Sequence, residues 1–261
     1  MGGDHAPKAV VEGVVAAVND FNVTNVLVGV EPKIPEELAT FNYPPDLIEI
    51  VHASEVVGMN EPAVTPIRRK KDSSIAKGVA LLKESHYDDF ISAGNTAAVV
   101  AASTISLGML EGVDRHAIGL VIPTLQGHAL IIDVGANTEA KPQHLLQSAQ
   151  IANVYAREVL GFAQPTLGLL NIGEEAGKGS GFEKEAYKLM EEKLPNFIGN
   201  IEANEVYLGK CNCIICDGFV GNVVLKVSEG LLESTGKLMK REIKKDPLAM
   251  IGAWLMRRRL M

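Results

Sequence analysis

The sequence contains polar turns that directly follow apolar stretches, and one of them is suited to binding an anion. Residues 92–96 read Ser-Ala-Gly-Asn-Thr and lead into a segment with helical spacing. Small residues at such a turn let a phosphate approach free backbone N–H groups and the positive end of the helix dipole. We therefore predict that Gly94, Asn95 and Thr96 bind substrate through a phosphate group. The alternative is an ordinary helix N-cap.

A second polar turn runs from Asp133 to Asn137 and is followed by Lys141. Asp133 ends an apolar stretch, and Pro142 suits the first turn of a helix, so Asn137 and Lys141 project from one short loop. A lysine in this place would neutralise a phosphate or a developing oxyanion. We predict catalytic roles for Asp133 and Lys141 and substrate binding by Asn137. The alternative for Lys141 is a solvated loop residue.

A third turn, residues 171–179, is long and carries two carboxylates, glycines and a lysine. We interpret it as a mobile loop at the rim of a pocket, with Gly173 and Glu174 as substrate-binding residues. A simple charged loop is the alternative. Lys178 is followed by Gly179, where a P-loop has Ser or Thr to bind magnesium, so the turn argues against ATP chemistry.

The fourth turn, residues 216–222, lies between a predicted strand and a long predicted helix. We predict a catalytic role for Asp217 in orienting a base or a water, and substrate binding by Gly218 and Asn222, because glycine permits close approach of a ligand to the backbone. An aspartate that caps its own helix is the alternative. Near the amino end, His5 is predicted to act as a general acid or base, with a role in capping the first helix as the alternative.

These turns separate strand-like from helix-like segments, which predicts an α/β protein with a mostly parallel sheet. Several strands are apolar throughout, as expected when helices cover both faces, so we expect a doubly wound α/β/α sandwich. The segment 123–128 is too short to hold a crossover helix and predicts an antiparallel hairpin. Strands are predicted at residues 25–30, 47–51, 89–92, 118–122, 129–133, 166–171 and 213–216, and helices at 7–19, 73–85, 96–107, 142–160, 181–193 and 221–245.

Composition restricts the class of function. The chain of 261 residues has a net charge of -7, which argues against a general nucleic-acid binder but allows small anionic substrates. Cys211, Cys213 and Cys216 have no nearby His or fourth Cys, so buried free cysteines are favoured over a metal site. On a strand, Cys211 and Cys213 would share one face and Cys216 would lie on the other. The sequence has no signal peptide, disulfide framework or apolar run long enough to span a bilayer, so we expect a cytoplasmic protein.

Two stretches carry clusters of cations. Arg68 to Lys71 is a basic run of the kind that is usually solvated, although such a run near a phosphate site would concentrate anionic substrate. Residues 248–256 are apolar, contain the only Trp and precede three arginines. We expect this stretch to contact a membrane surface through Ile251, Trp254 and Leu255. A dimer-interface helix is the alternative, and the two roles are compatible.

Together and in this order, the motifs resemble the phosphate acyltransferase family, and they span nearly the whole chain. The matching segments are Met1-Gly-Gly-Asp-His-Ala-Pro-Lys8, Arg68-Arg-Lys-Lys-Asp-Ser-Ser74, Ser92-Ala-Gly-Asn-Thr96, Asp133-Val-Gly-Ala-Asn137 with Lys141-Pro142, Leu170-Asn-Ile-Gly-Glu-Glu175 and Cys216-Asp-Gly-Phe-Val-Gly-Asn222.

The resemblance implies transfer of a long-chain fatty acyl group from acyl carrier protein to inorganic phosphate, giving acyl phosphate for phospholipid synthesis. It implies a fold like that of phosphotransacetylases and isopropylmalate-type dehydrogenases, without metal or organic cofactor. The implied partners are acyl carrier protein, inorganic phosphate, a second copy of the chain and a membrane glycerol-phosphate acyltransferase, with no nucleic acid. We expect residues 1–229 to form the α/β phosphate acyltransferase domain, and residues 230–261 to form a C-terminal helical segment for dimer or membrane contact.

The chain departs from the family pattern in places. Ala97 stands where glycine is usual, and Thr138-Glu139 alters the stretch after Asn137, but neither change removes a charged candidate. Family members usually have a strand before Met-Gly-Gly-Asp and continue with a glycine-rich segment and another strand, which this sequence does not contain. Two other functions stay open: a phosphotransacetylase-like enzyme that uses short acyl-CoA, and a noncatalytic anion-binding module. The dinucleotide fingerprint is absent, which counts against NAD binding.

Overall fold

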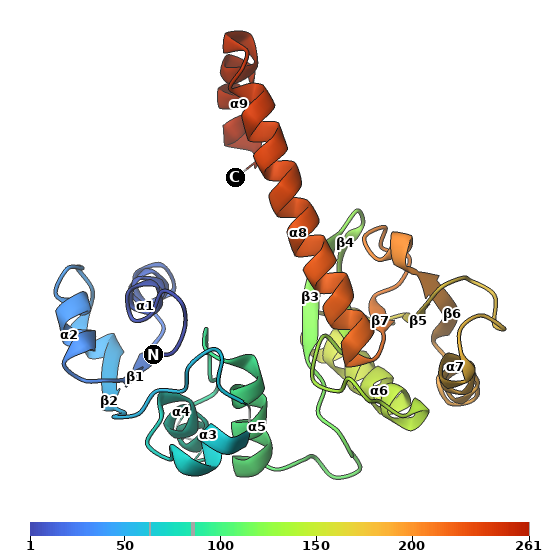
Figure 1. The fold of residues 1–261 in the computed structure, drawn as a ribbon, viewed down its shortest axis with the longest axis horizontal. Coiled ribbons are helices and arrows are strands. Elements are labelled where there is room, and N and C mark those ends of the chain that lie inside the picture. Colours follow the sequence, from blue (N-terminus) through green and yellow to red (C-terminus); the bar gives the residue numbers. More distant parts are fainter. Residues whose placement is uncertain (63, 85–86, 261) are drawn as a thin grey trace. The chain divides into compact units, whose positions relative to one another are not determined.

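The computed structural model describes residues 1–62, 64–84 and 87–260, without the side chains of residues 64–66 and 257–260. It forms two compact units, residues 1–116 and 117–261 (Figure 1). The strands that we predicted for one sheet are therefore divided between two sheets, one in each unit.

The first unit begins with a small α/β layer. Two short strands pair in parallel, with Asn25 opposite Ile48, and two helices cover them around buried Val11, Leu27 and Leu38. The elements are α1 (Lys8–Phe21), β1 (Asn25–Gly29), α2 (Lys33–Leu38) and β2 (Ile48–His52). The prediction from the sequence is confirmed for α1, β1 and β2, and it missed the six-residue α2.

Three helices make up the rest of the first unit: α3 (Val64–Arg69), α4 (Ser74–Lys83) and α5 (Thr96–Ser106). Val57, Ile67, Val79 and Ala102 form their common core. The strand predicted at 89–92 is wrong. Its apolar residues do not alternate into a sheet, because Phe90 packs over Gly78 and Ile91 is exposed. Residue 85, the last of the predicted helix 73–85, lies outside the described residues.

The second unit contains a five-stranded sheet in the order β3-β4-β7-β5-β6. Its first pair is antiparallel, with Gly119 opposite Ile132, so the predicted hairpin is confirmed, and the other pairs are parallel. The sequence did not predict β6, in which Gly199 adopts a positive φ that interrupts the strand pattern. The strands are β3 (Gly119–Thr124), β4 (Gly127–Ile132), β5 (Leu167–Asn171), β6 (Phe197–Glu202) and β7 (Cys213–Ile215).

Helices cover both faces of this sheet. On one face Leu145, Ala149 and Met190 pack against β4, β5 and β7, and on the other Val224 and Leu225 of α8 contribute to a second core. The mixed α/β fold with a mostly parallel sheet and a helical C-terminal end is therefore confirmed. The helices are α6 (Pro142–Glu158), α7 (Gly181–Lys193), α8 (Gly218–Ile243) and α9 (Pro247–Leu260). Because α8 runs unbroken through residues 229 and 230, the predicted division at this point does not coincide with a break between elements.

The three cysteines are buried and free, as predicted. Cys213 and Cys216 lie on opposite faces of the sheet, as predicted, but the face predicted for Cys211 is wrong: it belongs with Cys216 to the core opposite α6. The reason is that β7 begins only at Cys213, so the alternation of a strand does not extend back to Cys211. Burial raises the pKa of both Cys211 and Cys213 to about 12, which keeps these thiols protonated at neutral pH.

Candidate active site

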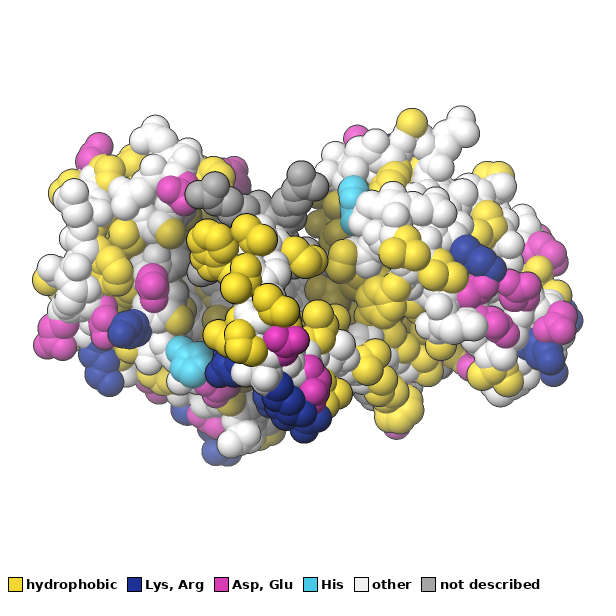
Figure 2. All heavy atoms as spheres, turned by 90° about the horizontal axis from the view of Figure 1, so that it is seen from above, with side chains coloured by type: hydrophobic (Ala, Val, Ile, Leu, Met, Phe, Trp, Pro, Cys, Tyr) yellow, Lys and Arg dark blue, Asp and Glu magenta, His cyan; other side chains and the backbone are white. Residues whose placement is uncertain are grey.

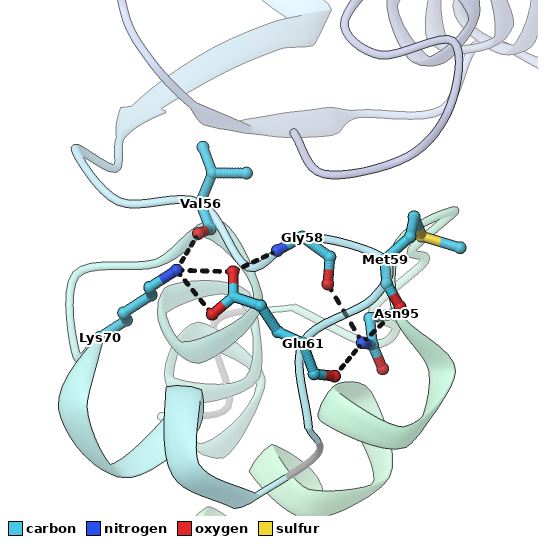
Figure 3. Close-up of polar contacts among 6 residues, drawn as sticks. All are labelled: Val56, Gly58, Met59, Glu61, Lys70 and Asn95. Carbon is cyan, nitrogen blue, oxygen red and sulfur yellow. Dashed lines mark hydrogen bonds and ion pairs between the residues drawn. The ribbon is translucent and has the colours of Figure 1, made fainter.

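In the first unit, the turn at residues 92–96 is organised by Asn95, which is buried (Figure 3). Its side-chain Nδ2 donates to the carbonyl oxygens of Gly58, Met59 and Glu61 at 3.2, 3.1 and 2.9 Å. Its Oδ1 accepts the backbone N–H of Ala98 at 3.0 Å and so caps α5. The amide is fully occupied by these bonds, so Asn95 has the N-cap role that we gave as the alternative.

The groups beside Asn95 that could still bind a phosphate are the backbone N–H groups at the start of α5 and the Thr96 hydroxyl. Thr96 and Ala97 begin α5 and are exposed, and the first N–H groups of a helix have no partner within it. The N–H of Gly94 donates to Ser92 Oγ at 3.2 Å. Phosphate binding by Gly94, Asn95 and Thr96 stays a prediction, and in this geometry it depends on the N–H groups and the Thr96 hydroxyl rather than on the Asn95 amide.

A lysine and a glutamate hold the segment that Asn95 grips (Figure 3). Lys70 Nζ lies 2.6 and 2.8 Å from the two carboxylate oxygens of Glu61 and donates to the carbonyl of Val56 at 2.8 Å. The same carboxylate accepts the backbone N–H of Gly58 at 2.7 Å. The bond from Gly58, followed by that from Lys70, lowers the pKa of Glu61. The segment 56–61 is therefore held through the side chain of Glu61 and through the backbone groups of Val56, Gly58, Met59 and Glu61.

The amino-terminal segment lies against both of these loops. A Cβ on Gly2 would lie 2.1 Å from the carbonyl oxygen of Val57, and one on Gly3 would lie 2.6 Å from that of Ala93. Only glycine allows this approach, which explains the Gly-Gly pair. His5 follows on this segment and is exposed, so the first unit brings the predicted His5 region and the 92–96 turn together. The catalytic role of His5 stays a prediction.

In the second unit, Asp133 organises the loop after β4 and is 2% exposed. Its Oδ1 accepts from the backbone N–H groups of Gly135 and Ala136 at 3.0 and 2.9 Å. Its Oδ2 accepts both the N–H and the side-chain amide of Asn137, at 2.8 and 2.9 Å, and Oδ1 also accepts the N–H of Ile118 at 3.2 Å. A carboxylate that accepts from five donors holds the loop in shape.

The start of α8 fits tightly against this loop. Asp217 caps the helix by accepting from the backbone N–H groups of Phe219 and Val220 at 2.8 and 3.0 Å. The N–H of Gly218 donates to the carbonyl of Asn137 at 2.9 Å, and a Cβ on Gly218 would lie 2.8 Å from the Asn137 nitrogen. A Cβ on Gly135 would lie 3.9 Å from Asn222 Cγ. The structure therefore brings together five predicted residues of the second unit: Asp133, Asn137, Asp217, Gly218 and Asn222.

The same loop leads into α6, where Lys141 is the N-cap residue and its side chain is exposed. Within the part of the chain that the structure describes, Lys141 Nζ has no ion pair or hydrogen bond. The Lys141 backbone N–H donates to His144 Nδ1 at 3.1 Å. Since Nδ1 accepts, the proton of the neutral imidazole is on Nε2, which can donate to a ligand. The sequence prediction missed His144, although its place three residues after Lys141 in the first turn of a helix was a usable signal.

The loop after β5, which we expected to be mobile, is fastened by buried amides. Asn171 Nδ2 donates to Asn200 Oδ1 at 3.1 Å and to the carbonyl of Lys178 at 3.3 Å, and Asn200 Nδ2 donates to the carbonyl of Glu175 at 2.8 Å. The two amides tie the middle of the loop, at Glu175, and its end, at Lys178, to β6 and β5. Sequence reasoning missed Asn200, because only its partners across the sheet give it this role.

Glu174 of this loop is held by a lysine from a distant part of the sequence. Lys210 Nζ lies 2.8 Å from Glu174 Oε1 and also bonds the carboxylate of Glu205. The carboxylates of Glu174 and Glu205 raise the pKa of Lys210, and the hydrogen bond from Lys210 is the main cause of the lowered pKa of Glu205. Gly173 lies beside Lys178, whose Cγ would be 2.8 Å from a Cβ at this position. Substrate binding by Gly173 and Glu174 stays a prediction.

Two kinds of site have no support in the structure. Among residues 1–62, 64–84 and 87–260, no group of three or more His, Cys, Asp or Glu side chains is placed to hold a metal ion. Over the same residues, we find no helix with the length and apolar character needed to cross a bilayer.

Comparison with solved structures places the fold in the class of phosphotransacylases. The EutD phosphotransacetylase of Staphylococcus aureus superposes with a TM-score of 0.59 at 18% identity, covering 86% of this chain and 79% of that one. A branched-chain phosphotransacylase from Enterococcus faecalis V583 superposes with a TM-score of 0.55 at 14% identity, covering 86% and 81%. At such identities the likeness shows the fold alone.

The sequence comparisons identify the family. The profile described as "Fatty acid synthesis protein" matches residues 1–261. A phosphate acyltransferase of Heliobacterium modesticaldum is 44% identical over 259 residues, which cover 98% of this chain and 76% of the relative. One from Citrifermentans bemidjiense is 46% identical over 258 residues, covering 99% and 73%. The chain belongs to the phosphate acyltransferase family, so the resemblance identified from the motifs is confirmed.

Proposed function

We propose that this protein transfers a long-chain fatty acyl group from acyl carrier protein to inorganic phosphate and releases acyl phosphate for phospholipid synthesis. The observation that carries the proposal is the near full-length identity of 44% to 46% with phosphate acyltransferases. The class of fold supports it, because solved phosphotransacylases share it. A membrane glycerol-phosphate acyltransferase would be the enzyme that receives the acyl phosphate.

The reaction we propose is direct attack. A phosphate oxygen attacks the carbonyl carbon of the thioester, a C–O bond forms, the C–S bond breaks, and the departing thiolate takes up a proton. Lys141 is suited to stabilise the oxyanion, since its charge is exposed and unpaired within the described residues. His144 Nε2–H is suited to donate a hydrogen bond to the attacking phosphate. The proton that the thiolate takes up is the one that the attacking hydrogen phosphate loses. An acyl-enzyme on cysteine is disfavoured, because all three thiols are buried and burial raises their pKa.

The assay compares three acyl donors in the presence of phosphate: palmitoyl-acyl carrier protein, palmitoyl-CoA and acetyl-CoA. Acyl phosphate is trapped with hydroxylamine and measured as the hydroxamate. We expect product from the palmitoyl carrier protein. Product from acetyl-CoA alone would instead indicate a phosphotransacetylase, and product from none of the donors would indicate an anion-binding module. Labelled acyl group found on Cys216 after denaturation would contradict direct attack.

We propose that α8 forms part of a homodimer interface. Val227, Leu231 and Leu238 recur at helical spacing along α8 and are exposed by 63%, 65% and 50%. A surface helix normally buries such a stripe, and a second copy of the same helix is an apolar partner of matching length. Sedimentation should show a dimer that Leu231→Glu dissociates, whereas Val154→Glu on α6 should leave it intact. A wild-type monomer would rule out this interface.

We propose that α9 contacts the membrane surface and that the protein acts in the cytoplasm as a peripheral protein. Ile251, Trp254 and Leu255 are exposed by 56%, 71% and 63%. Figure 2 shows hydrophobic side chains gathered over the C-terminal helices. Residues 230–261 would thus contact a second copy of the chain through α8 and a bilayer through α9. The arginines at 257–259, which we expected to support this contact, have side chains outside the described part.

A further inference from the structure

The basic run Arg68 to Lys71 contains both a cation that is paired with a carboxylate and cations that have no partner among the described residues. Lys70 is bound by Glu61, and Lys77 lies 2.7 Å from Asp72 and also donates to the carbonyl of His52. These two lysines hold loops of the first unit in place. Their charges are compensated, and they are not offered to a partner.

The other three cations of this stretch are Arg68, Arg69 and Lys71. All three are exposed, and none makes an ion pair or hydrogen bond with a described residue. Of the nearby carboxylates, Glu61 is paired with Lys70 and Asp72 with Lys77, while Glu55 accepts the backbone N–H of Asp72 at 2.9 Å. Three cations therefore lie together without an ion pair to a described residue, in a chain whose net charge is -7, and Glu55 is the one nearby carboxylate among the described residues not paired with a lysine.

The fold keeps these three cations close together. Arg68 and Arg69 form the last turn of α3, and Lys71 follows directly. Ser73 then caps α4, accepting the backbone N–H of Ala76 at 3.3 Å, so the positive end of a ten-residue helix adds to the same field. Arg68 and Arg69 also interact with the C-terminal end of the α3 dipole and so stabilise that helix. This role does not account for all three cations, because a helix of six residues has a small dipole and Lys71 lies outside it.

This surface is tied to the predicted phosphate turn within the same unit. Lys70, between the unengaged cations, grips Glu61, and the backbone carbonyl of Glu61 is one of the three bound by Asn95 at the start of α5. The segment 56–61 is thus a rigid link between the cationic surface and the turn at 92–96. A partner that binds the cations is held at a fixed position relative to this turn.

We propose that Arg68, Arg69 and Lys71 form the docking surface for the acidic carrier protein that presents the acyl group. This proposal rests on the proposed function. A single phosphate ion would engage one or two exposed side chains only weakly, whereas an acidic protein surface engages all three at once and gains in association rate. A nucleic acid needs more phosphate contacts than three cations provide, and the net charge of -7 repels it.

The test is a binding measurement on the full chain. Fluorescence anisotropy of labelled palmitoyl-acyl carrier protein is compared for wild type, for Arg68→Ala/Arg69→Ala/Lys71→Ala and for Lys184→Ala/Lys188→Ala/Lys193→Ala. The control removes three exposed lysines of α7 that likewise have no partner among the described residues, so both variants change the net charge equally. We expect the first variant to weaken binding about tenfold and the control less than about twofold. Raising the salt should weaken wild-type binding far more than that of the first variant.

Kinetics separate carrier docking from capture of phosphate. In the first variant, KM for palmitoyl-acyl carrier protein should rise while KM for phosphate and KM for uncharged palmitoyl-pantetheine stay unchanged. Unchanged carrier binding would overturn the proposal, and so would a rise in KM for phosphate with the pantetheine donor. Binding of a labelled oligonucleotide that only this variant loses would show that the partner is a nucleic acid. If wild type forms no acyl phosphate from any donor, the proposed function fails, and the anisotropy still decides whether the surface binds the carrier.

Discussion

Asp133 and Asn137 form a closed pair in which one carboxylate oxygen accepts both the backbone N–H and the side-chain amide of the same asparagine. Because Gly218 in turn donates to the Asn137 carbonyl, the pair also fixes the start of α8. The loop after β4 is thus shaped by a buried carboxylate that is 2% exposed. Through these bonds Asp133 positions the loop, and its catalytic role stays a prediction.

Asp133→Asn tests this role. The new amide would place N–H groups against at least one existing donor, either that of Asn137 or those of Gly135 and Ala136. We expect the free energy of unfolding to fall by about 1–3 kcal/mol, the cost of leaving a buried polar group unsatisfied. Denaturant unfolding measures it, with the exposed Asp20→Asn as control. An equal, small effect in the two variants would show that the loop does not depend on the carboxylate.

Asn95→Asp tests the corresponding hub in the first unit. The substitution keeps the cap on Ala98 but turns an oxygen toward the carbonyls of Gly58, Met59 and Glu61. Only a protonated carboxyl can donate there, so its pKa in the folded state should lie above that in the unfolded state. The variant should then be closest to wild type in stability at acidic pH and should lose stability as pH rises. Thermal unfolding across pH measures this, and the exposed Asn60→Asp should not show it.

Much of the second unit could be predicted because its signals are local. The strands β5 and β7 are buried apolar runs, and the turns after them carry Asn, Asp and Gly, so both the sheet and the positions of the polar turns follow from the sequence. The prediction of a strand at residues 89–92 was wrong because an apolar segment forms a strand only when a neighbouring strand pairs with it. Phe90 instead fills the space beside Gly78.

The roles of the site residues were harder to predict than their positions. Asn95, Asp133 and Asp217 all lie in the predicted turns, yet the side chain of each bonds mainly to backbone groups of the protein. For Asp133 and Asp217 most partners lie within four residues, whereas Asn95 bonds carbonyls more than 30 residues away, such as that of Gly58. The role of Lys210 could not be predicted from the sequence, because it contacts its partners Glu174 and Glu205 only in the folded protein.

Lys210→Met should reveal a pH-dependent contribution to stability. Lys210 lowers the pKa of Glu205 from its usual value of 4.5, so the ion pair stabilises the fold above that pH and loses its effect as Glu205 becomes protonated. The variant should be less stable than wild type at pH 7, and the difference should shrink below about pH 4.5. Urea unfolding at several pH values measures it. Lys188→Met on α7, an exposed lysine, is the control, and a difference that does not vary with pH would contradict the assignment.

Lys141→Met tests the proposed role in the reaction. Loss of one donor to an oxyanion typically lowers kcat by a factor of about 100 to 1,000, and we expect a loss of at least about 100-fold. Stability should not change, because the side chain is exposed. Lys184→Met on α7 is also exposed and should keep full activity. A higher KM for phosphate with unchanged kcat would instead assign Lys141 to substrate binding.

Trp254→Asp tests contact of α9 with a bilayer. Trp254 is the only tryptophan and is 71% exposed, so replacing it removes a large apolar side chain from the surface and adds a negative charge. Both changes oppose binding to anionic lipid. Flotation with vesicles of phosphatidylglycerol and phosphatidylcholine should show wild type bound and the variant free. Phe21→Asp alters an equally exposed aromatic residue on α1 and should leave binding intact, since that helix has no predicted membrane role. Equal flotation of wild type and Trp254→Asp would rule out this contact. The exposed residues of α9 would then be assigned to the dimer interface, which is the alternative role.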